Sequence, residues 1–184
     1  MDSKNKVRGS GVVGMVAAGL WLAALFVEYQ YGLLPPGNGS WLYYADQFVF
    51  FIALAGYLVM LLGLWQSKAI GDGKFGKISL GIFITGIAAL LIAQVVQWLT
   101  KNPDFFLYPI GGIFQLLGGL LTGIAVVLAK RWSGWQRFAP LLQGLYYAII
   151  LLIPIAVSNQ SPTQLTEGLW QVTWFITSLA LFTS

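Results

Sequence analysis

Six apolar stretches, each about the length of one bilayer crossing, fill nearly all of the 184 residues of this chain. At about 1.5 Å of rise per residue, a helix built from each stretch crosses the ~30 Å hydrocarbon layer of a membrane. Backbone polar groups in hydrocarbon leave only helices or closed barrels, and these stretches lack the period-two alternation of barrel strands. We therefore predict an all-α polytopic membrane protein, a bundle of six transmembrane helices that forms one domain over residues 1–184. The predicted spans are residues 12–33, 47–65, 78–99, 109–129, 138–157 and 165–184.

The composition supports the same class of protein. Hydrophobic residues make up 58% of the chain and charged residues only 9%, whereas soluble domains carry about one quarter charged residues. The short connections between the spans leave no room for a second, soluble domain. The chain has no cysteine, which excludes disulfides and thiolate chemistry.

The basic residues lie almost entirely on one side of the predicted membrane. Only Lys101 falls in a connection on the opposite side. Because basic residues are retained on the cytoplasmic face during insertion, we predict that both termini are cytoplasmic. Lys130 and Arg131 also suit anionic lipid headgroups, as an alternative to a role in topology alone. The residues on the predicted inner side are Lys4, Lys6, Arg8, Lys68, Lys74, Lys77, Lys130, Arg131 and Arg137.

The first apolar stretch is expected to remain as a span. It is longer than the apolar core of a signal peptide, and Val27 and Glu28 follow where small residues of a cleavage site would be needed. Asn38 and Asn159 begin glycosylation patterns on the predicted outer side, but nothing else indicates a eukaryotic secretory protein. We expect a multi-pass plasma membrane protein, in the inner membrane if the source is a Gram-negative bacterium.

The residue inventory excludes several chemistries. The absence of histidine excludes His-ligated haem, most zinc and copper sites, and Ser-His or Cys-His catalytic pairs. No glycine-rich phosphate loop is present. We therefore predict no metal site, no cofactor and no assigned catalytic residue. The acids in or near the spans, Glu28, Asp46 and Glu167, lie close to the outer boundary, which argues against ion-coupled transport.

Amide side chains gather in the outer half of the predicted spans. Gln94, Gln115 and Gln171 lie about 8–9 Å inside the outer boundary. An unpaired amide in hydrocarbon is costly, so each of these side chains needs a partner. One interpretation is hydrogen bonding between helices. The other is an outward-open pocket floored by two indoles at mid-membrane. Gln143 is the lone counterpart nearer the inner side. The candidate pocket residues are Glu28, Gln94, Gln97, Gln115, Glu167, Gln171, Trp21 and Trp174.

Polar aromatic residues are densest at the predicted outer interface. They are anchors to the interface in one interpretation and an outer-face ligand site in the other. The members of this patch are Tyr29, Tyr31, Trp41, Tyr43, Tyr44 and the flanking Asp46.

Small residues predict which helix faces pack. Gly119 and Gly123 form a GxxxG pattern, which suits close helix packing within this chain or a contact between two copies. Pro154 is predicted to end the fifth span or to kink it near the outer face.

Three hypotheses about function follow from this inventory. The first is a non-enzymatic integral membrane protein, either an accessory subunit or a binder of a lipid or other apolar ligand near the outer face. The second is a channel or uncoupled carrier for a small neutral solute, because amide and glycine linings suit uncharged substrates. The third is an outer-leaflet enzyme with Glu28, Asp46 or Glu167 as its acid or base. Expected partners are membrane lipids, and another membrane subunit or a second copy of the chain, but not nucleic acid.

Overall fold

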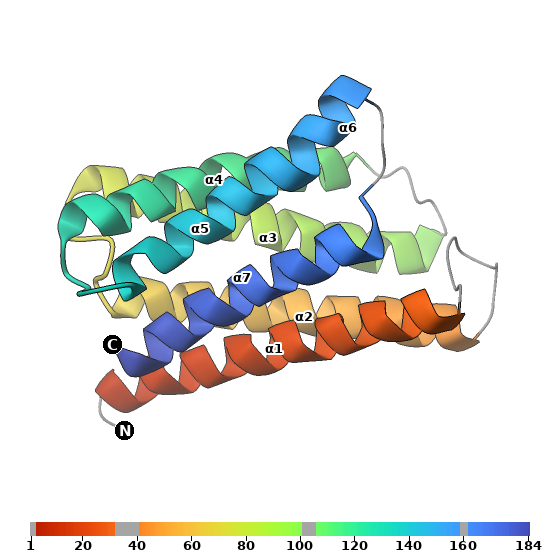
Figure 1. The fold of residues 1–184 in the computed structure, drawn as a ribbon, viewed down its shortest axis with the longest axis horizontal. Coiled ribbons are helices and arrows are strands. Elements are labelled where there is room, and N and C mark those ends of the chain that lie inside the picture. The colour runs from red at the N-terminus through yellow and green to blue at the C-terminus, as the bar shows by residue number, and fades with distance from the viewer. Residues whose placement is uncertain (1–2, 32–40, 101–105, 159–161) are drawn as a thin grey trace.

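The structure, a computed structural model, describes residues 3–31, 41–100, 106–158 and 162–184, and every regular element within these ranges is helical. Helices α1 to α4 are each long and apolar enough to cross a membrane. The remaining two predicted spans coincide with α7 and with a continuous helical rod made of α5, η2 and α6. The elements are α1 (Ser3–Tyr31), α2 (Trp41–Gln66), α3 (Lys74–Thr100), α4 (Leu107–Ala129), the 3-10 helix η1 (Gln136–Phe138), α5 (Ala139–Tyr146), the π-helix η2 (Tyr147–Leu152), α6 (Ile153–Ser158) and α7 (Gln164–Thr183) (Figure 1).

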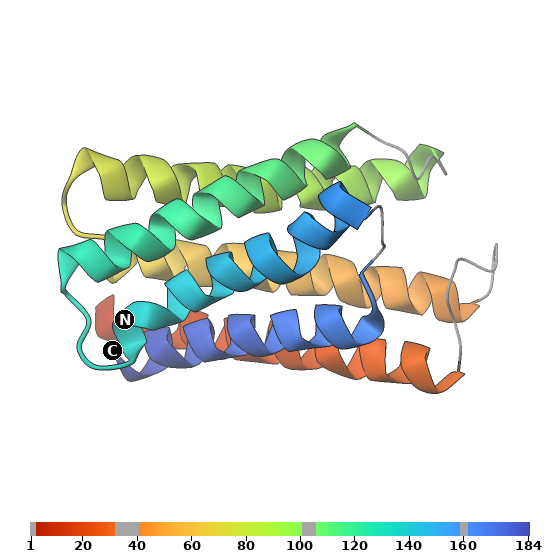
Figure 2. The ribbon, with the colours of Figure 1, turned by 45° about the horizontal axis from the view of Figure 1, so that its top comes forward.

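The helices form a closed ring in which each rod contacts its two neighbours. The order around the ring is α1, α2, α3, α4, α5 and α7, and α7 returns to pack along α1. Figures 1 and 2 show the rods running side by side, with the start of α1 and the end of α7 at the same end of the bundle. We call this the near end and the opposite one the far end.

Glycines allow the helix backbones to approach each other closely. A Cβ atom added at Gly118 of α4 would lie 2.3 Å from the backbone nitrogen of Phe83 in α3, and one at Gly123 would lie 2.4 Å from the Cα of Leu141 in α5. Gly119 and Gly123, the GxxxG pair, both face α5 of the same chain. The pattern therefore serves packing within the bundle, where small residues let helices associate without a hydrophobic driving force.

The outside of the bundle is apolar and its middle is aromatic. Tyr57 and Trp174 are 1% and 0% exposed in the centre, whereas Ile78 and Leu128, on the outer surfaces of α3 and α4, are 62% and 67% exposed. A water-soluble bundle would place polar side chains on those outer surfaces. An apolar exterior around a buried, partly polar interior is typical of a protein that has lipid as its neighbour.

The fifth rod changes its geometry just before Pro154. This proline has no N–H and its ring crowds the carbonyl four residues earlier, so the helix loses one backbone hydrogen bond before this position. The wider π-helical turn of η2 precedes the proline, and the helix then continues as α6 to Ser158. The rod therefore does not end at Pro154. Among the described elements α6 contacts only η2, and Figure 1 shows it diverging from α7.

Candidate functional site

A chain of polar side chains crosses the bundle near its far end. Nε2 of Gln47 donates to Oδ2 of Asp46 at 3.3 Å, and Nε2 of Gln94 donates to Oε1 of Gln47 at 2.7 Å. The Tyr108 hydroxyl lies 2.7 Å from Oε1 of Gln94 and close to Oε1 of Gln97, and it donates its single proton to one of the two. These bonds join α2, α3 and α4 in one layer.

Carboxyl groups extend this layer to α1 and α7. The carboxyl groups of Glu28 in α1 and Asp46 are joined by a hydrogen bond. Such a bond requires that one of the two carboxyl groups carries a proton. Glu167 of α7 lies within electrostatic range of both. The polar layer therefore includes side chains from five helices, α1, α2, α3, α4 and α7. We call this set the far-end layer: Glu28, Asp46, Gln47, Gln94, Gln97, Tyr108 and Glu167.

A second polar group lies deeper, around Trp174. The Tyr57 hydroxyl donates to Oε1 of Gln171, which is 1% exposed. The Tyr57 ring stacks on Trp174 with centroids 4.1 Å apart, and Phe83 covers the same indole at 5.5 Å. Among the described residues, Nε2 of Gln171 and Nε1 of Trp174 are buried without a hydrogen-bond partner. These three rings fill the centre of the helical ring.

Gln115, Thr122 and Gln143 form a third group, in the middle of the α4–α5 contact. A Cβ atom at Gly119 would lie 3.2 Å from Oε1 of Gln143, and Gln115 and Thr122 are one turn to either side of Gly119 on α4. Each of the three polar side chains is at most 1% exposed and lacks a hydrogen-bond partner within the described part of the chain. Gln143 therefore packs against Gly119 at the middle of α4, deeper in the bundle than the sequence predicted. The predicted span start at residue 138 agrees with the start of α5 at Ala139, so the difference comes from the offset between the two rods, in which Gly144 packs against Gly119 and Leu120.

The two mid-membrane indoles have different neighbours. Trp21 makes an edge contact with Phe50 at 3.9 Å between centroids, whereas Trp174 lies against Tyr57 and Phe83. Phe50 is two helical turns nearer the far end of α2 than Tyr57. A common floor made of both indoles stays a prediction.

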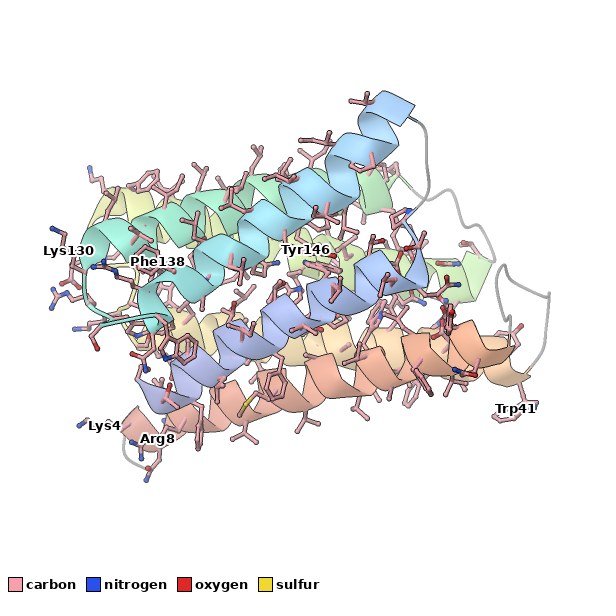
Figure 3. All side chains as sticks on the ribbon, viewed as in Figure 1. Lys4, Arg8, Trp41, Lys130, Phe138 and Tyr146 are labelled. Carbon is pink, nitrogen blue, oxygen red and sulfur yellow. The ribbon has the colours of Figure 1, made fainter. Side chains whose placement is uncertain are left out.

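The described aromatic side chains of the outer patch face outward, whereas its Asp46 belongs to the far-end layer. Tyr29, Trp41 and Tyr44 are 69%, 75% and 51% exposed, and Figure 3 shows Trp41 at the far end. The side chains of Tyr31 and Tyr43 lie outside the described residues, as do the predicted outer turns around Asn38, Asn102 and Asn159.

A polar and aromatic cluster lies where α5 and η2 contact α7, next to the point at which α6 diverges from α7. The Tyr146 hydroxyl donates to the backbone oxygen of Thr166 at 3.0 Å, and Tyr147 packs against Trp170 with centroids 5.1 Å apart. Glu167 lies within electrostatic range of Tyr147. Nε1 of Trp170 is buried and has no hydrogen-bond partner among the described residues. We call Tyr146, Tyr147, Glu167 and Trp170 the notch.

Sequence reasoning missed several members of these groups. Gln47 and Tyr108 lie at the boundaries of predicted spans, where polar side chains are common and do not indicate a buried hydrogen bond. Tyr57 lies in the middle of a predicted span, and its phenol was the available signal, because a buried tyrosine hydroxyl usually finds a partner.

In the part of the chain that the structure describes, no group of three or more His, Cys, Asp or Glu side chains is placed to hold a metal ion. Comparison of the chain with protein-family models, with curated proteins and with solved structures gives no match.

Proposed function

We propose that this chain is a non-enzymatic plasma membrane protein with six spans, which binds a lipid or other apolar ligand in its far-end half. In this proposal the near end is cytoplasmic and the far end faces outward. The excess of basic residues in the near-end segments supports this orientation, because such residues stay on the cytoplasmic side. The rod from residue 139 to 158 and the helix α7 supply the two further spans, since about twenty residues suffice for ~30 Å.

The divergence of α6 from α7 is the observation that carries the ligand proposal. Because α6 contacts only η2 among the described elements, we expect a bilayer lipid to reach the residues of the notch from the side. Apolar side chains flank this opening on both helices: Val157 of α6 is 79% exposed, and Leu165 and Leu169 of α7 are 70% and 48% exposed. An acyl chain or other apolar body between these side chains would remain in a hydrocarbon-like environment.

The notch also offers polar groups to the other end of such a ligand. The Trp170 N–H is a buried donor without a protein partner among the described residues, and Glu167 supplies a carboxyl group beside it on the same helix. A buried donor without an acceptor is costly, and an ester or hydroxyl oxygen of a ligand would satisfy it. An amphipathic ligand therefore matches the notch better than a purely apolar one.

Purification in a mild detergent, followed by extraction and mass spectrometry of bound small molecules, tests this proposal. We expect one lipid class or other apolar molecule to remain bound. Trp170→Phe keeps the ring and removes the N–H, so retention should fall about fivefold, which corresponds to one hydrogen bond of ~1 kcal/mol. Trp65→Phe, at an exposed tryptophan near the opposite end, is the matched control. Protein that carries no small molecule, or equal losses in the two variants, would refute the proposal.

A path for a small neutral solute is the second candidate, and the third polar group favours it. Gln115, Thr122 and Gln143 offer buried donors and acceptors at the middle of the bundle. The stacked pair of Tyr57 and Trp174 would then act as the barrier in the centre of the ring. Flux of glycerol and urea into liposomes that contain the purified protein tests this idea. Trp174→Ala should increase the flux, and vesicles that stay sealed with both proteins would exclude it.

A further inference from the structure

A cavity of about 320 Å³ lies at the near end of the bundle. Its walls come from four parts of the chain, the start of α1, the end of α2, the connection between α4 and η1, and Ser184, which follows α7. The residues that matter are Lys4 and Val7 from the first, Gln66 and Ser67 from the second, and Arg131 and Trp132 from the third. This cavity is far from the notch, and the argument for it is independent of the proposed function.

The cavity combines an apolar wall with a cationic rim. Val7 and Trp132 are 9% and 6% exposed, so they form a buried side that a hydrocarbon or glycerol group can contact. Lys4 and Arg131 are exposed, and Figure 3 shows Lys4, Arg8 and Lys130 together at this end of the bundle. A site with these two surfaces suits a molecule that is anionic at one end and apolar at the other.

Both cations have hydrogen-bonding capacity to spare. Nη2 of Arg131 donates to Oδ2 of Asp72 at 3.0 Å, which leaves further N–H groups of the five that a guanidinium carries. Within the described residues that pair is the one ion pair, so Lys4 has no carboxylate partner there. The Ser67 hydroxyl, by contrast, already donates to the Leu64 carbonyl at 2.8 Å. Recognition of an anion therefore depends on Lys4 and Arg131.

The ends of the neighbouring helices increase this dependence. Helices α2 and α7 both end beside the cavity, since Gln66 and Ser184, the residue after α7, line it, and helix C-termini carry a partial negative charge. Without the two side-chain cations the cavity would repel an anion. With both of them present it offers the paired cationic donors that phosphate oxygens prefer.

We propose that this cavity binds a phosphate ester, with Lys4 and Arg131 as its ligands and Val7 and Trp132 as the apolar wall. Two sources share this chemistry, the headgroup of an anionic phospholipid and a soluble phosphate compound. The apolar wall favours the phospholipid, because inorganic phosphate or glycerol phosphate would leave that wall uncovered.

Native mass spectrometry of the full chain with added phosphatidylglycerol or phosphatidylcholine separates the two headgroups. We expect phosphatidylglycerol to be retained selectively, and the double variant Lys4→Gln/Arg131→Gln to weaken its binding about thirtyfold, since each of the two basic residues contributes ~1 kcal/mol near a surface. The matched control Lys74→Gln/Lys77→Gln removes the same charge from exposed positions at the same end. It should keep the selective binding. Equal losses in the two double variants would mean unspecific charge attraction and would overturn the proposal.

Two further arms complete the test. Asp72→Asn breaks the ion pair with Arg131 but keeps the cation, so it should bind phosphatidylglycerol at least as tightly as the parent chain. A loss as large as that of the double variant would show that the pair has only a structural role, and would overturn the proposal.

Thermal unfolding with inorganic phosphate and glycerol phosphate identifies the source of the phosphate group. A stabilisation that requires Lys4 and Arg131 indicates a soluble phosphate ligand, and the lipid arm alone indicates the headgroup. No response in either arm refutes the site.

Discussion

The ring of Tyr57 lies nearly parallel to the indole of Trp174, with an interplanar angle of 9° and centroids 4.1 Å apart. This stack joins α2 and α7 across the centre of a ring of helices that otherwise contact mainly their neighbours. The Tyr57 hydroxyl also donates to Gln171, one turn from Trp174 on α7. One side chain thus supplies both an aromatic contact and a buried hydrogen bond in the interior of the bundle.

Substitutions at this stack should separate its two contributions. Tyr57→Phe removes the hydrogen bond to Gln171 but keeps the ring, and we expect a loss of ~0.6–2 kcal/mol. Trp174→Ala removes a large side chain from a fully buried position and should cost ~3–5 kcal/mol. Unfolding titrations in mixed micelles measure both. A larger effect of Tyr57→Phe than of Trp174→Ala would contradict the packing described here.

The far-end layer predicts energetic coupling between α2 and α3. Gln47→Leu and Gln94→Leu each break the same 2.7 Å bond, so the double variant should be less destabilised than the sum of the two by ~0.6–2 kcal/mol. Gln94→Leu combined with Thr183→Val, on another helix at the opposite end, is the control and should be additive within ~0.5 kcal/mol. Additivity in both pairs would mean that the bond contributes nothing to stability.

The glycines of α4 should be sensitive to substitution, unlike those that face outward. Gly118→Ala places a Cβ atom 2.3 Å from the backbone of Phe83, which forces α3 and α4 apart at a cost of ~1–3 kcal/mol. Gly19→Ala in α1 meets nothing within 4 Å, and replacing a mid-helix glycine there should stabilise by ~0.5–1 kcal/mol. Opposite signs in the two unfolding midpoints are the expected result. A neutral Gly118→Ala would contradict the close approach of the two helices.

The proposed six-span topology is testable by cysteine labelling, because the chain starts with no cysteine. Single cysteines at positions 38, 102 and 160 should react with an impermeant reagent from outside intact cells. Cysteines at positions 73 and 133 should react only after the membrane is opened. Labelling of position 73 from outside would reverse the proposed orientation.

The positions of the helices could be read from the sequence, but their ends could not. The apolar stretch predicted at residues 12–33 corresponds to α1, which begins at Ser3. Lys4, Lys6 and Arg8 end the apolar run but not the helix, since Val7 among them and Ser10 just after them are buried in the bundle. Hydropathy reports where hydrocarbon ends, whereas a helix ends where its backbone bonds and packing end.

The polar groups were predictable as residues but not as pairs. Depth along a span follows from residue number, so the amides at positions 94, 115 and 171 could be assigned to the far-end half. Their partners depend on how each helix is rotated and shifted against the next. Gly144 packs on Gly119, and this contact rather than the hydropathy places Gln143 at the middle of α4. Such offsets are set by interdigitating side chains and leave no periodic signal in one sequence.

The isolation of α6 also determines how its own residues are constrained. Leu151, in the last turn of η2, is 4% exposed and must fit the shape of a solid protein interior. Val157, two turns later, is 79% exposed, and in the proposed membrane setting its neighbour is liquid hydrocarbon, which adapts to any contour. Steric identity is therefore fixed at the first position and free at the second, where only transfer free energy matters. Within two turns of one helix, the constraint on a side chain therefore changes from a fit to the neighbouring protein atoms to hydrophobicity alone.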